Sequence, residues 1–161
     1  MLQEDLEALE RFLSALEWSL ACWARYPGQF QLALAHIDYR NPQRIGDAYG
    51  AKAGSLKLDE VAHSLRRTFR KTDLVARNGT DFWILLPHVP AIDKVSEKIR
   101  YIVDTWSDEG LKIVERDVAF FVIDQEVVQL TDSFTPLEIL TYLKENHRRH
   151  ASYEQAFAAA A

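Results

Sequence analysis

The sequence predicts a single α/β (α+β) domain in which a mixed central β-sheet is flanked by helices and preceded by an N-terminal helix. Apolar residues recur at helical spacing in several segments, and short apolar runs typical of strands lie between them. Asn78-Gly79, between two such runs, indicates a β-hairpin. Because a hairpin pairs antiparallel and a strand–helix–strand crossover implies parallel pairing, we expect both kinds in one sheet.

The N-terminal helix, over residues 1–28, is predicted by a heptad seam that ends at Tyr26-Pro27-Gly28. The apolar residues of the seam are Leu2, Leu6, Leu9, Leu13, Leu16, Leu20 and Trp23. Two interpretations are equally supported. The helix packs on its own domain, or it forms a helix–helix contact with a second chain, for which three heptads are about the minimum.

The main domain is expected over residues 29–150, with a tail at 151–161 in which no strand is visible. The expected strands are 30–38, 73–77, 82–86 and 118–123. The expected helices are 43–49, 51–70, one marked by apolar residues from Ile92 to Trp106, and one from Pro136 to about Arg149.

Composition limits the classes of function. The 161 residues fit one domain, and Cys22 is alone, so no internal disulfide can form. The formal net charge of -5 argues against general nucleic-acid binding but leaves room for a small nucleotide in a local basic pocket. No apolar run is long enough to span a bilayer and the N-terminus does not read as a secretory signal, so we expect a cytoplasmic protein.

Four segments carry a resemblance to a known family. They are A-H-I-D at 35–38, I-G-D-A-Y-G at 45–50, D-L-V-A-R at 73–77 and N-G-T-D-F at 78–82. In this order and register they resemble the first strand, the "I-N-D-x-x-G" turn, the "D-L-V-A-R" strand and the signature hairpin of the GGDEF (diguanylate cyclase) family. The resemblance implies the nucleotidyl-cyclase, palm-like fold of that family, with a degenerate signature.

The resemblance also implies a metal site, because the family joins two GTP molecules with the help of divalent metal. Its ligands would be the Asp38 carboxylate, the Tyr39 carbonyl and an acid at the third signature position. The signature here is one residue short. If Phe82 is its Phe, then the neutral Thr80 is third and Asp81 is fourth.

The alternative register, counted forward from Arg77, makes Asp81 the third residue and puts Phe82 in place of the acid. We prefer the first register because Phe82, Ile84 and Leu86 then share one face of a strand. In either register one of the two acids is lost.

Other positions of the family's active site are also altered. The Asn and Asp that read the guanine edge fall on Gly46 and Ser55. Lys144 and Arg148 match the phosphate-contacting residues of the last helix, although a basic helix C-terminus favoured by the macrodipole explains them equally well. We therefore expect a vestigial site without cyclase activity, without bound metal and without a cofactor, magnesium being needed only for residual activity.

A second motif, Arg70-Lys71-Thr72-Asp73, matches the "R-x-x-D" inhibitory site at which the family binds cyclic di-GMP, and Arg100 falls where many members supply a second Arg. An Arg fork can pair with guanine O6 and N7 or with phosphate. The alternative is a solvated basic helix end capped by its own Asp.

Three hypotheses follow. The first is an inactive receptor for cyclic di-GMP, whose N-terminal helix links ligand state to a homodimer or a partner protein. The second is a protein-interaction module that keeps the fold but binds no nucleotide. The third is a weak residual cyclase that uses Asp38 and Asp81.

Overall fold

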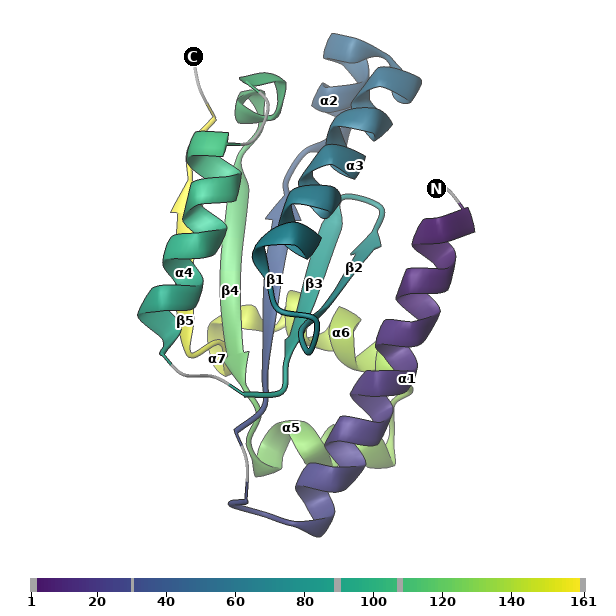
Figure 1. Cartoon of the computed structure of the whole chain (residues 1–161), viewed down its shortest axis with the longest axis vertical. Helices are drawn as coiled ribbons and strands as arrows, with labels where there is room; N and C mark the ends of the chain where they lie inside the picture. The colour runs from purple at the N-terminus through teal and green to yellow at the C-terminus, as the bar shows by residue number, and fades with distance from the viewer. Residues whose placement is uncertain (1–2, 30, 89–90, 107–108, 160–161) are drawn as a thin grey trace.

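The computed structural model of the chain describes residues 3–29, 31–88, 91–106 and 109–159. Their strands form one sheet in the order β2-β3-β1-β4-β5, with helices on both faces (Figure 1). The strands are β1 (Ala33–Tyr39), β2 (Leu74–Asn78), β3 (Asp81–Leu86), β4 (Arg116–Val122) and β5 (Tyr153–Phe157). The α-helices are α1 (Gln3–Arg25), α2 (Pro42–Tyr49), α3 (Ala51–Thr68), α4 (Ile92–Arg100), α5 (Gln125–Gln129), α6 (Pro136–Glu145) and α7 (His147–His150). Shorter helical turns are η1 (Tyr101–Trp106), η2 (Glu109–Ile113) and η3 (Leu130–Asp132).

The predicted class, a central sheet flanked by helices, is confirmed, but the expected parallel pairing is wrong. Every strand pairing that the structure describes is antiparallel. β1 and β2 do run in the same direction, as the crossover through α2 and α3 requires. They do not pair because β3 lies between them.

The alternation of side chains along β1 divides the core into two layers. Ala35 and Ile37 face a cluster built with α2, α3 and α4, while Leu32 and Leu34 face a cluster built with α1, α5 and α6. In Figure 1 α3 and α4 lie in front of the sheet, α6 lies behind it, and α5 lies at its lower end. His36 and Asp38 continue the second face beyond the part that is packed in the apolar cluster.

The heptad seam of α1 packs on its own domain, which is the first of the two interpretations. Leu9, Leu16 and Leu20 are buried in the second cluster together with Phe12. Leu6 is exposed, and Leu2 lies outside the described residues. A contact between α1 and another chain therefore has to use the outer side of the helix, where Trp18 is 71% exposed.

The expectation of a tail without a strand after residue 150 is wrong for Tyr153–Phe157, which form β5 and pair with β4. Apolar patterning missed this strand because it is a short edge strand with Glu154 exposed and Gln155 half-buried. The strand forms because it pairs with β4, and the Ser152 amide just before it donates a hydrogen bond of 2.7 Å to the Phe120 carbonyl. Within the described ranges no helix has the length and apolarity needed to cross a bilayer.

The packing of α2 against α3 predicts a stability difference between two glycines. A Cβ at Gly54 would lie 2.9 Å from the Cγ2 atom of Ile45, whereas a Cβ at Gly46 would meet nothing within 4 Å. We expect Gly54→Ala to lower the free energy of unfolding by about 1–3 kcal/mol, because overpacking outweighs the helix propensity of Ala. Gly46→Ala, the matched control, should be neutral or stabilising by up to about 1 kcal/mol.

Both values can be measured by urea unfolding followed by circular dichroism. Equal effects of the two substitutions would contradict the close packing of Gly54 on Ile45.

Candidate functional site

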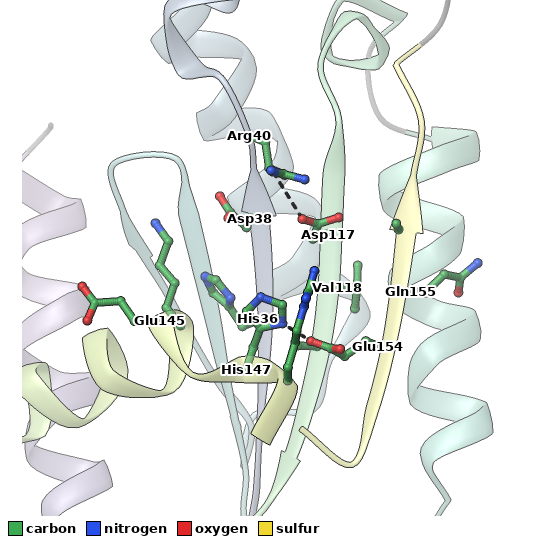
Figure 2. Close-up of a pocket in the computed structure, with 13 residues that line it drawn as sticks. His36, Asp38, Arg40, Asp117, Val118, Glu145, His147, Glu154 and Gln155 are labelled. Carbon is green, nitrogen blue, oxygen red and sulfur yellow. Dashed lines mark hydrogen bonds and ion pairs between the residues drawn. The ribbon is translucent and has the colours of Figure 1, made fainter. Parts of the chain in front are cut away.

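An open pocket of about 620 Å³ lies between the end of α6, α7 and the strands β1, β4 and β5 (Figure 2). His36, Asp38 and Asp117 lie on the strands, and Lys144 and Arg148 come from the helices. The pocket combines acidic and basic side chains, so its chemistry depends on which of them are paired with each other. The remaining lining residues are Arg40, Val118, Ala119, Glu145, His147, Glu154, Gln155 and Ala156.

Asp81, at the start of β3, is paired on both carboxylate oxygens. Its Oδ1 lies 2.9 Å from His36 Nε2, and its Oδ2 accepts a hydrogen bond of 2.9 Å from Lys144 Nζ. Burial alone would raise the pKa of Asp81, but the hydrogen bonds from His36 and Lys144 outweigh it and hold the pKa below its ordinary value. Asp81 is therefore a partly buried carboxylate whose charge is compensated within the protein.

His36 is fixed from a second side by Trp83. The two rings stack with centroids 4.2 Å apart and planes 22° apart, and the residues face each other in the β1–β3 register. His36 is only 4% exposed. The structure thus makes His36 a buried, hydrogen-bonded strand histidine.

Asp38 lies between two other acids in one row across the sheet. The register places it opposite Asp81 of β3 and opposite Asp117 of β4. Burial raises the pKa of Asp38, as do the charges of Asp81 and Asp117, while Lys144 and His36 act in the opposite direction. Asp117 is partnered by Arg40, whose Nε lies 3.5 Å from Asp117 Oδ2. No hydrogen bond or ion pair of the Asp38 side chain occurs among the described residues.

The hairpin between β2 and β3 turns at Gly79 and Thr80, with Gly79 at a φ of 65°. Among two-residue hairpin loops, the type II′ turn has Gly at its first central position. The Thr80 carbonyl accepts a hydrogen bond of 3.2 Å from the Tyr39 amide, and Phe82 packs edge-on against the Tyr39 ring at 5.7 Å. Burial of that ring raises the pKa of Tyr39 far above its ordinary value.

Phe82, Ile84 and Leu86 share the face of β3 that is buried against α3 and α4, and the register of the signature stays a prediction. Asp81 therefore faces the pocket side together with Asp38. Thr80, the third residue in that register, adds a neutral hydroxyl to the turn in place of an acid.

Arg77 is buried and ties the hairpin to α3. Its guanidinium donates to the Gly79 carbonyl at 2.8 Å, to the carbonyl and hydroxyl oxygens of Ser55 at 3.3 Å each, and to Asp59. A buried Asp5 of α1 lies 3.8 Å from the same group. Ser55, one of the two expected base-reading positions, is thus used by the scaffold, whereas Gly46 borders open space.

The R-x-x-D motif forms the turn between α3 and β2. The Asp73 carboxylate accepts a hydrogen bond of 3.2 Å from the Arg70 amide, and the Asp73 amide donates to the Arg70 carbonyl at 2.9 Å. The Arg70 side chain is exposed, and Arg100 is exposed at the C-terminal end of α4. Lys98 lies 5.7 Å from the Phe69 ring centroid, so the ends of α3 and α4 are adjacent.

Comparison with known proteins identifies the family. The profile of the diguanylate cyclase GGDEF domain matches residues 9–117, more than half of the chain. The chain belongs to the GGDEF domain family. The family is one of diguanylate cyclases, and the match covers the hairpin, Asp38 and the R-x-x-D motif.

Among curated proteins, the uncharacterized protein YhcK of Bacillus subtilis is 35% identical to this GGDEF chain over 89 residues. The match covers 55% of this chain and 24% of YhcK, so the chain spans about a quarter of that relative's length.

Solved structures show the same fold at low sequence identity. The GGDEF domain of YfiN (TpbB) from Pseudomonas aeruginosa has a TM-score of 0.60 at 19% identity, covering 89% of this chain and 91% of that one. The diguanylate cyclase SiaD of the same bacterium, solved with its activator SiaC, has a TM-score of 0.60 at 21% identity. The match covers 83% of this chain and 54% of that one. The GGDEF domain of DgcB from Caulobacter crescentus, solved in complex with cyclic di-GMP, has a TM-score of 0.60 at 16% identity. The match covers 88% of this chain and 86% of that one.

The divalent metal that the GGDEF family implies does not fit the residues of this pocket. Magnesium needs several free oxygen ligands with near-octahedral geometry. Both Asp81 oxygens are taken by His36 and Lys144, and Thr80 supplies no charge. In the described part of the chain no group of three or more His, Cys, Asp or Glu residues is placed to hold a metal ion.

The sequence predicted some of these neighbours and missed others. It predicted that Asp38, Asp81, Lys144 and Arg148 belong to one site, and Asp81 and Lys144 are in contact while Asp38 and Arg148 line the same pocket. It missed Asp117, whose place opposite Asp38 depends on the β1–β4 register. Composition and spacing do not encode that register.

The pKa of Asp81 is lowered and the pKa of Asp38 is raised, so removing the two charges should have opposite effects on the free energy of unfolding. Asp81→Asn should lower the free energy of unfolding at pH 7 by about 1–3 kcal/mol, because charge-assisted hydrogen bonds are lost. Since the native pKa of Asp81 lies below the unfolded value of 3.8, its contribution is present above that pH and disappears as the pH falls through the native pKa. Denaturant unfolding between pH 7 and pH 3 measures this.

Asp38→Asn is the matched control. The native pKa of Asp38 is raised, so ionised Asp38 costs stability, and its removal should be neutral or stabilising at pH 7. That gain should vanish when the pH falls below the unfolded carboxyl pKa. The same loss of stability in both variants at pH 7 would contradict the assignment.

Proposed function

We propose that this chain is a catalytically inactive GGDEF domain that binds cyclic di-GMP through Arg70, Asp73 and Arg100. The observation that carries the proposal is the pair of exposed arginines formed by Arg70, in the turn after α3, and Arg100, at the adjacent end of α4. Neither guanidinium has a partner in the part of the chain that the structure describes. Such groups are available to an anionic ligand without first breaking an internal ion pair.

The chemistry of the motif suits a guanine dinucleotide. An arginine fork pairs in bidentate fashion with guanine O6 and N7 or with a phosphate. Asp73 is half-buried and held by the Arg70 amide through Oδ2, which leaves Oδ1 to accept from guanine N–H groups. The DgcB domain solved with cyclic di-GMP supports the class of ligand.

The inactive part of the proposal rests on the pocket around Asp38. The Asp81 carboxylate is compensated by His36 and Lys144, and Thr80 is neutral. Ser55 is hydrogen-bonded to Arg77, and Gly46 has no side chain to read a base edge. A site whose one unpaired acid near the hairpin is Asp38, and which has no base-reading groups, lacks the means to align and activate two triphosphates.

The proposed route from ligand to partner runs through α1, as a homodimer or a complex with another protein. Because the inner side of α1 is packed on the sheet, the outer side with Trp18 is the surface available for such a contact.

Arg70→Ala should weaken cyclic di-GMP binding by more than tenfold, on the order of 1.4 kcal/mol, because a charge-assisted hydrogen bond is removed. Isothermal titration calorimetry measures the effect. Lys71→Ala is the matched control: it removes a neighbouring exposed charge at a variable position of the R-x-x-D motif, so its effect should be several-fold smaller.

Absence of cyclic di-GMP binding by the wild-type protein would reject the receptor and leave the interaction module. Binding that is lost in Arg148→Ala but kept in Arg70→Ala would assign the ligand to the pocket around Asp38 instead.

Purified protein incubated with GTP and magnesium or manganese should form no cyclic di-GMP, since Thr80 is neutral, Asp81 is occupied, and the base-reading groups are missing or occupied. Chromatography of the nucleotides after overnight incubation checks this, with an active GGDEF domain as positive control. Product formation that Asp38→Asn abolishes would establish the residual cyclase.

A further inference from the structure

Three aspartates form a continuous row across the centre of the sheet. Asp81 of β3, Asp38 of β1 and Asp117 of β4 face one another in register. Carboxylates directly opposite on neighbouring strands repel each other, and partial burial strengthens the repulsion. A row of this kind needs a cation next to it in the folded protein.

Lys144 supplies that cation from a rigid position. It lies in the last turn of α6, where the macrodipole favours positive charge. The helix is fixed at its start by a capping box between Thr135 and Glu138, and Leu140 and Leu143 are buried beneath it. Burial alone would lower the pKa of Lys144, but Asp81 and Asp38 hold it above its ordinary value, so the side chain stays charged.

Arg40 compensates only the far end of the row. It is more than half exposed and is shared between Asp117 and Glu115. Lys144 is therefore the cation that serves the centre of the row, where Asp38 has no partner of its own among the described side chains.

We propose that Lys144 is a resident counterion for Asp38 and Asp81, and that its ion pair with Asp81 acts with the His36 hydrogen bond and the neutral Thr80 to keep the wild-type protein from binding a divalent metal there. A divalent ion at these carboxylates would have to displace Lys144 from Asp81 and would sit beside its charge. The inference rests on the inactive half of the proposed function and is independent of binding at Arg70.

Removal of the ammonium should convert the row into a cation site. In Lys144→Gln, Asp38 and Asp81 keep their register and lose their main compensating charge, and hard oxygen ligands suit Mn²⁺. We expect Lys144→Gln to bind one Mn²⁺ at least tenfold more tightly than the wild type, and Asp38→Asn in the same background to abolish the gain.

Mn²⁺ titration followed by electron paramagnetic resonance measures binding without any nucleotide or turnover. Lys144→Arg keeps a cation and should bind no more Mn²⁺ than the wild type, and Lys52→Gln, at an exposed site on α3, controls for net charge. Circular dichroism checks that each variant is folded. If Lys144→Gln does not fold, Lys144→Met retains the aliphatic stem and replaces it.

Two results would overturn the proposal. One is wild-type protein that binds a single Mn²⁺ as tightly as the variant, with binding lost in Asp38→Asn. The other is a folded, uncharged variant at position 144 that gains no Mn²⁺ affinity. Failure of cyclic di-GMP to bind would reject the proposed receptor function only, because that binding is measured through Arg70 variants with no metal present.

Discussion

The register of β1 against its two neighbours is the constraint on which the site depends. Hydrogen bonding to β3 and β4 places His36 opposite Trp83 and Asp38 opposite both Asp81 and Asp117. A slip of one residue would turn every side chain of β1 to the other face and bury the Asp38 carboxylate among α3 and α4. The apolar residues that alternate with them fix this register, so the packing of the core determines where the charges meet.

This arrangement brings carboxylates together that repel each other, and cationic side chains of the same protein compensate the repulsion. Three carboxylates share one row, and His36, Lys144 and Arg40 approach it from a strand, a helix and the end of β1. Buried charges are tolerated when they are paired and hydrogen-bonded. In this GGDEF domain side chains compensate Asp81 and Asp117, and Asp38 is the member of the row that has no ion pair among the described residues.

Much of the fold could be predicted from sequence because its signals are local. The heptad spacing of α1, the hairpin signal at Asn78-Gly79 and the apolar run of β4 each depend on residues close together in the sequence. The structure places the turn itself one residue later, at Gly79 and Thr80. The antiparallel order and the strand β5 could not be predicted, since both depend on which distant strand lies next to another. The resemblance placed Asp38, Asp81 and Lys144 in one site, but the ion pair between Lys144 and Asp81 is a tertiary contact between residues 63 positions apart.

The two positions expected to read a base differ in how firmly they belong to the scaffold. Ser55 is tied to Arg77, which also holds Asp59 and the hairpin carbonyl, whereas residue 46 borders free space. Among descendants of a common ancestor, position 46 should therefore drift with little selection on stability. Positions 55, 59 and 77 should instead change together, as an inherited unit, because altering one leaves a buried guanidinium short of an acceptor.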